Sequence, residues 1–206
     1  MGGANHDEGI AFALVRVQIV PIQTEADYES AVNAILPGHA SDVVALYPAA
    51  AFGGPVVAYA FFLSDVFTCT MRRQAQWMDI HHARPYLYQF SRVNGFGAAQ
   101  GIGAFHGTEL PYVFGNFIPP FTVDATDLAI SQFMMGAWTH FAADGTPTGT
   151  SPPEWTRYRT ALDNYMQVAD TVSLQTGLSA QRCDILSAWG DQLVRDETLA
   201  LQQLEH

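Results

Sequence analysis

The stretch GAFHGTELPYVFG, residues 103–115, carries more information about the fold than any other part of this sequence. It places His106 in a glycine-flanked loop, downstream of an apolar segment at 85–93 that predicts a β-strand. A histidine in such a loop can present its imidazole at the end of a sheet, where proton transfer is commonly carried out. The alternative, a loop histidine that is hydrogen-bonded only for structural reasons, stays open on this evidence.

The composition predicts a globular chain and argues against nucleic acid as a partner. Hydrophobic residues make up 49% of the 206 positions and charged residues 14%, which is ample for a buried core. The net charge of −11 repels phosphate backbones. The most apolar window, residues 55–67, is interrupted by Ser64 and Asp65 and is too short to span a bilayer.

The two ends of the sequence look unlike the ends of a complete domain. The first ten residues, MGGANHDEGI, predict a polar loop with no strand before it, and we expect a chain cut from something larger. No signal peptide is visible. The last three residues, 204–206, resemble the start of a histidine tag and are excluded from the fold.

The pattern along the chain predicts several helices and few strands. Thr24 and Asp124 are expected to cap helices at 24–35 and 124–143, and Gly145 to end the second one. Further helices are expected at 41–48, 55–79 and 178–193, and strands at 86–91 and 165–168. This α/β pattern fits part of an open sheet better than a self-sufficient fold.

Four smaller features of the chain remain. Arg72 and Arg73 are expected near the solvent end of the helix at 55–79. The segment GFGAAQ at 95–100 lacks the third small residue and the following helix of a dinucleotide fingerprint, and no cofactor is expected. Neighbouring histidines at 81–82 cannot chelate one metal ion without distant ligands. Cys69 and Cys183 are either buried free thiols or a bridge, and their number alone does not decide between the two.

Several of these stretches, in the same order, resemble the later part of the type-B carboxylesterase/lipase family, which includes the cholinesterases. They are NHDEG at 5–9, FHGTELPYVFG at 105–115, EWTRY at 154–158 and the segments around the two cysteines. The family consists of α/β-hydrolases with a Ser–Glu–His triad in that chain order. The resemblance implies an α/β fold, with residues 1–203 as the C-terminal portion of one α/β-hydrolase domain: late strands plus packing helices.

The resemblance assigns the triad acid to Glu8 and the triad histidine to His106. His106 would take a proton from a serine hydroxyl and return it to the leaving alcohol, while Glu8 orients the imidazole and stabilises the imidazolium. Without the motif, Glu8 would be interpreted as a solvated loop carboxylate. Asp7 is adjacent but should point elsewhere. Glu109 is a rival for orienting His106, although the family pattern makes it a structural, paired residue.

One departure from the family pattern limits this assignment. The sequence contains no GxSxG elbow: Ser151 and Ser179 have a glycine two residues before them but none two residues after. The glycine motif of the oxyanion hole is also missing. We therefore expect a carboxylic ester hydrolase fragment, inactive alone, whose partner is the N-terminal portion as a second chain or cleaved remainder. Its substrate would be a small ester. The alternative is a non-catalytic cholinesterase-like binding module or an inactive fragment.

The family resemblance also implies a disulfide between Cys69 and Cys183. A bridge between these positions would close a loop of 114 residues (183 − 69) and, by chain entropy, stabilise the fold by about 4–5 kcal/mol. If it forms, an oxidising compartment and a secreted parent enzyme are expected.

Overall fold

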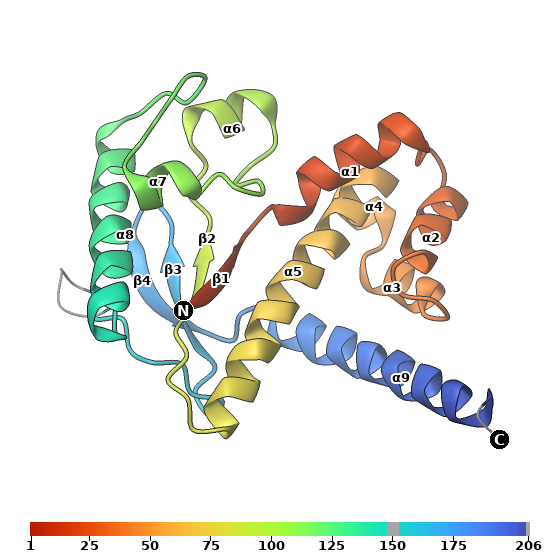
Figure 1. The fold of residues 1–206 in the computed structure, drawn as a ribbon. Helices are drawn as coiled ribbons and strands as arrows, with labels where there is room; N and C mark the ends of the chain where they lie inside the picture. The colour runs from red at the N-terminus through yellow and green to blue at the C-terminus, as the bar shows by residue number, and fades with distance from the viewer. Residues whose placement is uncertain (148–152, 205–206) are drawn as a thin grey trace.

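The computed structural model describes residues 1–147 and 153–204, which form a four-stranded sheet flanked by helices (Figure 1). The sheet order is β1-β2-β3-β4. The strands are β1 (Gly2–Asn5), β2 (Leu87–Phe90), β3 (Asn164–Val168) and β4 (Val172–Thr176). β1, β2 and β3 run parallel, and β4 pairs antiparallel with β3. Parallel neighbours need long crossover connections, and here these contain the helices.

The helices are α1 (Glu8–Ile19), α2 (Glu25–Asn33), α3 (Ala40–Leu46), α4 (Ala49–Phe52), α5 (Pro55–Ile80), α6 (Gly95–Gln100), α7 (Leu110–Phe114), α8 (Ala125–Asp144) and α9 (Ala180–Leu204). The predicted caps are confirmed: the Thr24 and Asp124 side chains each accept a hydrogen bond from the third helical residue in a complete capping box. Gly145 ends α8 with a φ of +71°. This left-handed conformation is what makes glycine the preferred residue there.

Two helices cover opposite faces of the sheet (Figure 1). On the α8 face, Phe90 and Met166 pack in one buried cluster with Met134 of α8. On the other face, Leu87 packs with Ala75 of α5. Because successive strand residues point to opposite faces, one short strand can contribute to both cores. A third cluster joins α5 to α1, α2, α3 and α9.

The start of the chain differs from the prediction. The first ten residues were expected to form a loop, but they contain β1 and the first three residues of α1. The sequence GGAN has low strand propensity. Its pairing with β2 makes it a strand, and the ring of Tyr88 lies so close that a Cβ on Gly3 would be 2.3 Å from Tyr88 Cδ1. The long-range partner, not the local sequence, decides the conformation.

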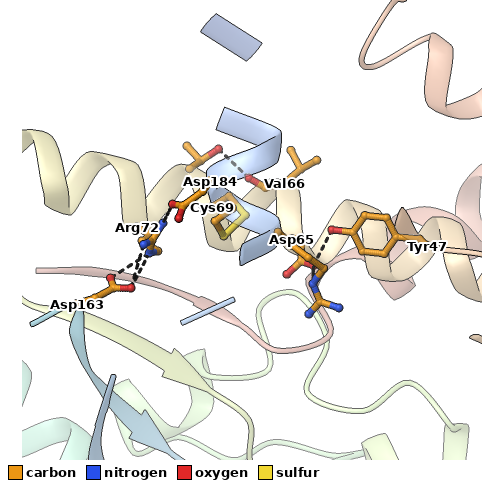
Figure 2. The surroundings of a disulfide bond; sticks show 10 residues. Tyr47, Asp65, Val66, Cys69, Arg72, Asp163 and Asp184 are labelled. Carbon is orange, nitrogen blue, oxygen red and sulfur yellow. Dashed lines mark hydrogen bonds and ion pairs between the residues drawn. A yellow bond between two sulfur atoms is a disulfide. The ribbon is translucent and has the colours of Figure 1, made fainter. Parts of the chain in front are cut away.

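Other predictions were incomplete or wrong. The strand predicted at 165–168 is β3, but it is not the last, because the exposed strand β4 follows it in a hairpin. The segment at 95–100 is itself a helix, α6, capped by the Asn94 side chain. Arg72 is buried, contrary to its expected place near solvent, because Asp163 and Asp184 pair with it (Figure 2). The proline- and glycine-rich composition of residues 146–153 also predicts a loop, of which residues 148–152 lie outside the described residues. Residues 205–206 of the predicted tag remnant at 204–206 lie outside them as well.

Candidate active site

Glu8 lies just beyond the carboxyl end of β1 and is the first residue of α1. Asn5 ends the strand, and its backbone N–H donates a 2.7 Å hydrogen bond to Glu8 Oε1. The Glu8 side chain is 8% exposed, so water competes little for this carboxylate. The carboxyl ends of parallel strands are where open α/β sheets bind ligands. The local backbone therefore fixes one carboxylate oxygen and leaves the other for a partner.

Close packing of α1 on α5 sets the position of Glu8. Gly9 lies directly against α5: a Cβ added there would be 2.1 Å from the Ala60 carbonyl oxygen. The Gly9 N–H donates to Ser64 Oγ at 2.9 Å, and that hydroxyl donates in turn to Ala60 O. The two helices approach this closely because residue 9 has no side chain.

His106 lies in the loop between α6 and α7, and its Nδ1 is 2.5 Å from Glu8 Oε2. The imidazole is half exposed, with 52% of its side chain accessible. Gly107, the next residue, has a φ of +84°, which lets the loop turn sharply after the histidine. Residues separated by 98 positions in the chain thus form one carboxylate–imidazole pair.

Hydrogen bonds from Asn5 and Asp7 hold this loop in place. Asn5 Nδ2 donates to the carbonyl of Phe105 at 2.8 Å. The Asp7 N–H donates to Ala104 O at 3.1 Å, and the Ala104 N–H donates to Asp7 Oδ2 at 2.8 Å. Asp7 and Phe105 also form an isolated parallel bridge. The loop is therefore attached to the strand that leads into Glu8.

The two rival carboxylates have other partners. Besides Ala104, Asp7 pairs with His6 Nδ1 at 2.9 Å. Glu109 Oε2 accepts from Asn5 Nδ2 at 2.5 Å. The structure therefore brings Glu8 against His106. Glu109 is paired as expected, but it is partly exposed, whereas the family pattern implies a buried residue.

Asn5 was not predicted as a site residue. It hydrogen-bonds both to Glu8 and to Phe105, the residue before His106. A buried asparagine that ends a glycine-rich segment gives no recognisable signal in sequence.

Electrostatics beside the pair favour a charged His6–Asp7 contact. The hydrogen bond to Asp7 raises the pKa of His6 above its ordinary value. Burial acts to raise the pKa of Asp7, but hydrogen bonds from His6 and from the Ala104 N–H outweigh it and hold that pKa below its ordinary value. Asp7 therefore stays ionised while it holds the loop, and its carboxylate oxygens are hydrogen-bonded to His6 and to the Ala104 N–H.

A protein-family model, described as the carboxylesterase family, matches residues 57–186, which is well over half of the chain. The chain belongs to the carboxylesterase family. The recognition made from the sequence motifs is confirmed, and so is the fold class: the mixed sheet and its packing helices are part of an α/β-hydrolase fold. The matched range includes His106 and both cysteines, whereas Glu8 precedes it.

Curated relatives are similar over part of their length. The chain is 33% identical to bile salt-activated lipase of Bos taurus over 112 residues, which is 52% of this chain and 19% of that protein. It is 28% identical to acylcarnitine hydrolase of Rattus norvegicus over 61% of this chain and 23% of that protein. It is 26% identical to fumonisin B1 esterase of Sphingopyxis macrogoltabida over 76% of this chain and 29% of that protein. The chain thus spans less than a third of each relative.

The disulfide that the family resemblance implied is present. Cys69 of α5 is bonded to Cys183 of α9, with a Cα–Cα distance of 4.8 Å. Beside it, the Arg72 guanidinium forms ion pairs with Asp163 at 2.9 Å and with Asp184 at 2.7 Å (Figure 2). The bond and the ion pairs together fix α9 and the start of β3 to the long helix that also contacts α1.

Among the side chains that the structure describes, there is no group of three or more histidine, cysteine, aspartate or glutamate residues arranged to hold a metal ion. Within residues 1–147 and 153–204, every helix is too short or too polar to cross a bilayer.

Proposed function

We propose that Glu8 and His106 are the acid and the base of a carboxylic ester hydrolase site. The observation that carries this proposal is the 2.5 Å hydrogen bond between Glu8 Oε2 and His106 Nδ1. A carboxylate on Nδ1 holds the proton there and leaves Nε2 as the basic nitrogen. Because half of the imidazole is exposed, Nε2 is available to a reacting group.

The chemistry follows from this geometry. His106 Nε2 takes the proton of a serine hydroxyl as its oxygen attacks the ester carbonyl carbon. The same nitrogen then gives that proton to the leaving alcohol, which breaks the C–O bond and leaves an acyl-serine. Nε2 then takes a proton from water as the water oxygen attacks the acyl carbon, and gives it to the serine oxygen as the acyl C–O bond breaks, which releases the carboxylic acid and regenerates the serine. Glu8 stabilises the imidazolium that forms in each half-reaction.

The nucleophile would come from a second polypeptide segment, the N-terminal portion of the same enzyme. The sequence has no GxSxG serine. Beside the candidate site, α1 presents Phe12, Val15 and Ile19 along one face at helical spacing, 41%, 62% and 75% exposed. Within the described residues, β1 pairs on one edge only. An apolar stripe and an open strand edge are surfaces that a further piece of the same sheet would cover.

The proposal extends to the domain and its location. Residues 1–203 are assigned to the C-terminal portion of one α/β-hydrolase domain, and residues 204–206 to a tag remnant. The Cys69–Cys183 disulfide supports an oxidising, extracellular location. The substrate is a small carboxylic ester.

Covalent labelling tests where the nucleophile lies. The purified protein, with every polypeptide that stays bound to it, is treated with a fluorophosphonate and each chain is weighed by intact mass spectrometry. We expect the label on a serine of a companion polypeptide and none on this chain. Stoichiometric labelling of a serine within this chain would overturn the divided site.

Kinetics test the two assigned residues. Hydrolysis of a p-nitrophenyl ester is compared for the preparation that retains the companion polypeptide, with this chain unaltered or carrying His106→Ala or Glu8→Gln. We expect kcat to fall by roughly 10²–10⁴-fold in each, the usual contribution of a positioned base or its orienting acid. His140→Ala is the matched control, because His140 is 42% exposed and also faces a carboxylate, Asp144 at 3.7 Å. Activity unaffected by His106→Ala would instead support a non-catalytic or inactive module.

A further inference from the structure

Two phenylalanine rings lie against the imidazole of His106. The Phe12 ring is centred 5.1 Å from the imidazole at an interplanar angle of 57°, and the Phe67 ring 5.6 Å from it at 42°. The two phenyl rings also stack on each other, 5.4 Å apart and 17° from parallel. These spacings lie within the range in which aromatic pairs attract each other beyond simple burial.

A single hydrogen bond leaves the imidazole a good deal of freedom. Glu8 holds one atom, Nδ1, and a ring held at one atom can still rotate about that contact. His106 is half exposed and its loop contains a left-handed glycine, so the neighbouring backbone restricts the ring little. Proton transfer, however, requires Nε2 to keep its direction toward both the attacking and the leaving oxygen. Something else must fix the plane of the ring.

The arrangement of the helices supplies that restraint. Glu8 and Phe12 are four residues apart on α1, so they lie on the same face one turn from each other. One helix face therefore presents both the carboxylate for Nδ1 and a phenyl ring for the side of the imidazole. Phe67 comes from α5, two residues before the disulfide-bonded Cys69, which anchors that part of α5 to α9.

Core packing alone does not account for this pair. Phe12 and Phe67 belong to none of the three buried clusters, whereas the half-buried Phe61 and Phe133 each pack against one. Their shared contact is the imidazole. We infer that Phe12 and Phe67 are positioning residues that hold the imidazole plane of His106, an inference that rests on the proposed role of His106 as the base.

Chemical modification of His106 measures this restraint without any need for turnover. Diethyl pyrocarbonate acylates accessible imidazole nitrogen, and peptide mass spectrometry of the full chain gives the rate at His106 relative to His140, an internal reference on α8. We expect Phe12→Ala and Phe67→Ala each to raise this ratio by roughly two- to tenfold, which corresponds to the loss of one aromatic pair. Phe12→Tyr and Phe67→Tyr, which keep the ring, are expected to restore the original ratio.

Leu14→Ala is the matched control. Leu14 lies on the same helix and is 43% exposed, close to the 41% of Phe12, but it follows Phe12 by two residues and so faces another side of α1. Its ratio should not change. Thermal unfolding of every variant checks that the fold persists, since partial unfolding would accelerate His140 as well. A ratio that stays constant in both alanine variants overturns the inference.

Steady-state kinetics separate positioning from substrate binding. In the preparation that hydrolyses p-nitrophenyl esters, positioning residues should lower kcat by roughly two- to tenfold and leave KM nearly unchanged. A raised KM with constant kcat means that the rings bind substrate, and overturns the inference. Two failures can be told apart. If His106→Ala leaves hydrolysis intact, the proposed function fails. If His106→Ala is inactive but the phenylalanine variants keep both kcat and the ratio of His106 to His140 modification, only the positioning role is removed.

Discussion

Substituting Gly9 by alanine should displace the candidate acid from the candidate base without touching either residue. An added Cβ would lie 2.1 Å from the Ala60 carbonyl oxygen and 2.7 Å from the Ser64 backbone nitrogen. Both are backbone atoms, which cannot rotate away. Since real Cβ contacts are essentially never shorter than 3.0 Å, α1 has to move by about 0.9 Å relative to α5.

That displacement is large compared with the hydrogen bond it disturbs. Glu8 immediately precedes Gly9, and its Oε2 is 2.5 Å from His106 Nδ1. A shift of this size away from the histidine would lengthen the contact to about 3.4 Å, near the limit of a useful hydrogen bond. We expect kcat for a p-nitrophenyl ester to fall about 10²-fold. Overpacking should also lower the free energy of unfolding by about 1–3 kcal/mol.

Gly190→Ala provides the control, because a Cβ at that position of α9 meets no atom within 4 Å. It should leave kcat unchanged and, by improving helix propensity, keep or slightly raise stability. Urea unfolding measures the second effect independently of activity. If Gly9→Ala has the kcat and the unfolding midpoint of the unaltered protein, then the tight approach of α1 to α5 does not determine the position of Glu8.

Three further predictions concern the supports around the site. Cys69→Ala should lower the free energy of unfolding by about 5 kcal/mol, the chain-entropy value for a closed loop of 114 residues, and urea unfolding of this variant should be insensitive to reductant. Asp127 is buried, which acts to raise its pKa, but hydrogen bonds led by that of Arg92 lower it overall. Its contribution to stability is therefore present above the ordinary pKa of about 3.9 and lost as the pH falls through the folded-state value. Asp127→Asn should be destabilised by about 3 kcal/mol at pH 7 and lose less further stability on acidification, as urea midpoints between pH 2 and 7 will report. Arg72→Met leaves a largely buried Asp163 without its cation and should cost about 3 kcal/mol, whereas Arg73→Met, which breaks a pair that is half exposed, should cost less than about 1 kcal/mol in the same assay.

Local signals in the sequence were sufficient for the start of α2 and for both ends of α8. Thr24 and Asp124 each precede an acidic residue at the third helical position, a pattern whose hydrogen bonds form within one turn. Gly145 ends a helix because the left-handed conformation costs glycine little. These features depend on residues close in the chain, so no knowledge of the tertiary structure is needed to predict them.

The features that were missed depend on distant partners. β1 has a sequence of low strand propensity and becomes a strand by pairing with β2, more than 80 residues later. Arg72 is buried because Asp163 and Asp184 neutralise it, and neither is close in sequence. β4 alternates apolar and polar residues, but it has only two apolar positions, Val172 and Leu174, and is largely exposed, so its pattern is too short to be recognised as a strand.

The candidate site depends partly on local sequence and partly on residues that are distant in the chain. A glycine-flanked histidine was recognisable from local sequence, but nothing local relates His106 to a carboxylate 98 residues earlier. Resemblance to a family supplied that pairing, and it also selected Glu8 over Asp7 and Glu109. Asn5 and Gly9 were overlooked because their importance lies in a hydrogen bond and a close contact that exist only after the strands and helices have assembled.

The disulfide places His106 inside a covalent ring and leaves Glu8 outside it. The ring that it closes, from Cys69 to Cys183, contains His106 but leaves Glu8 outside on the N-terminal arm. A protease that cuts once anywhere inside the ring yields fragments that stay linked on a non-reducing gel, so the histidine is retained with the body of the protein. A single cut between α1 and α2, at residues 20–24, instead separates the segment that holds the carboxylate, which is then attached by non-covalent contacts alone. Limited digestion would therefore remove the acid and spare the base.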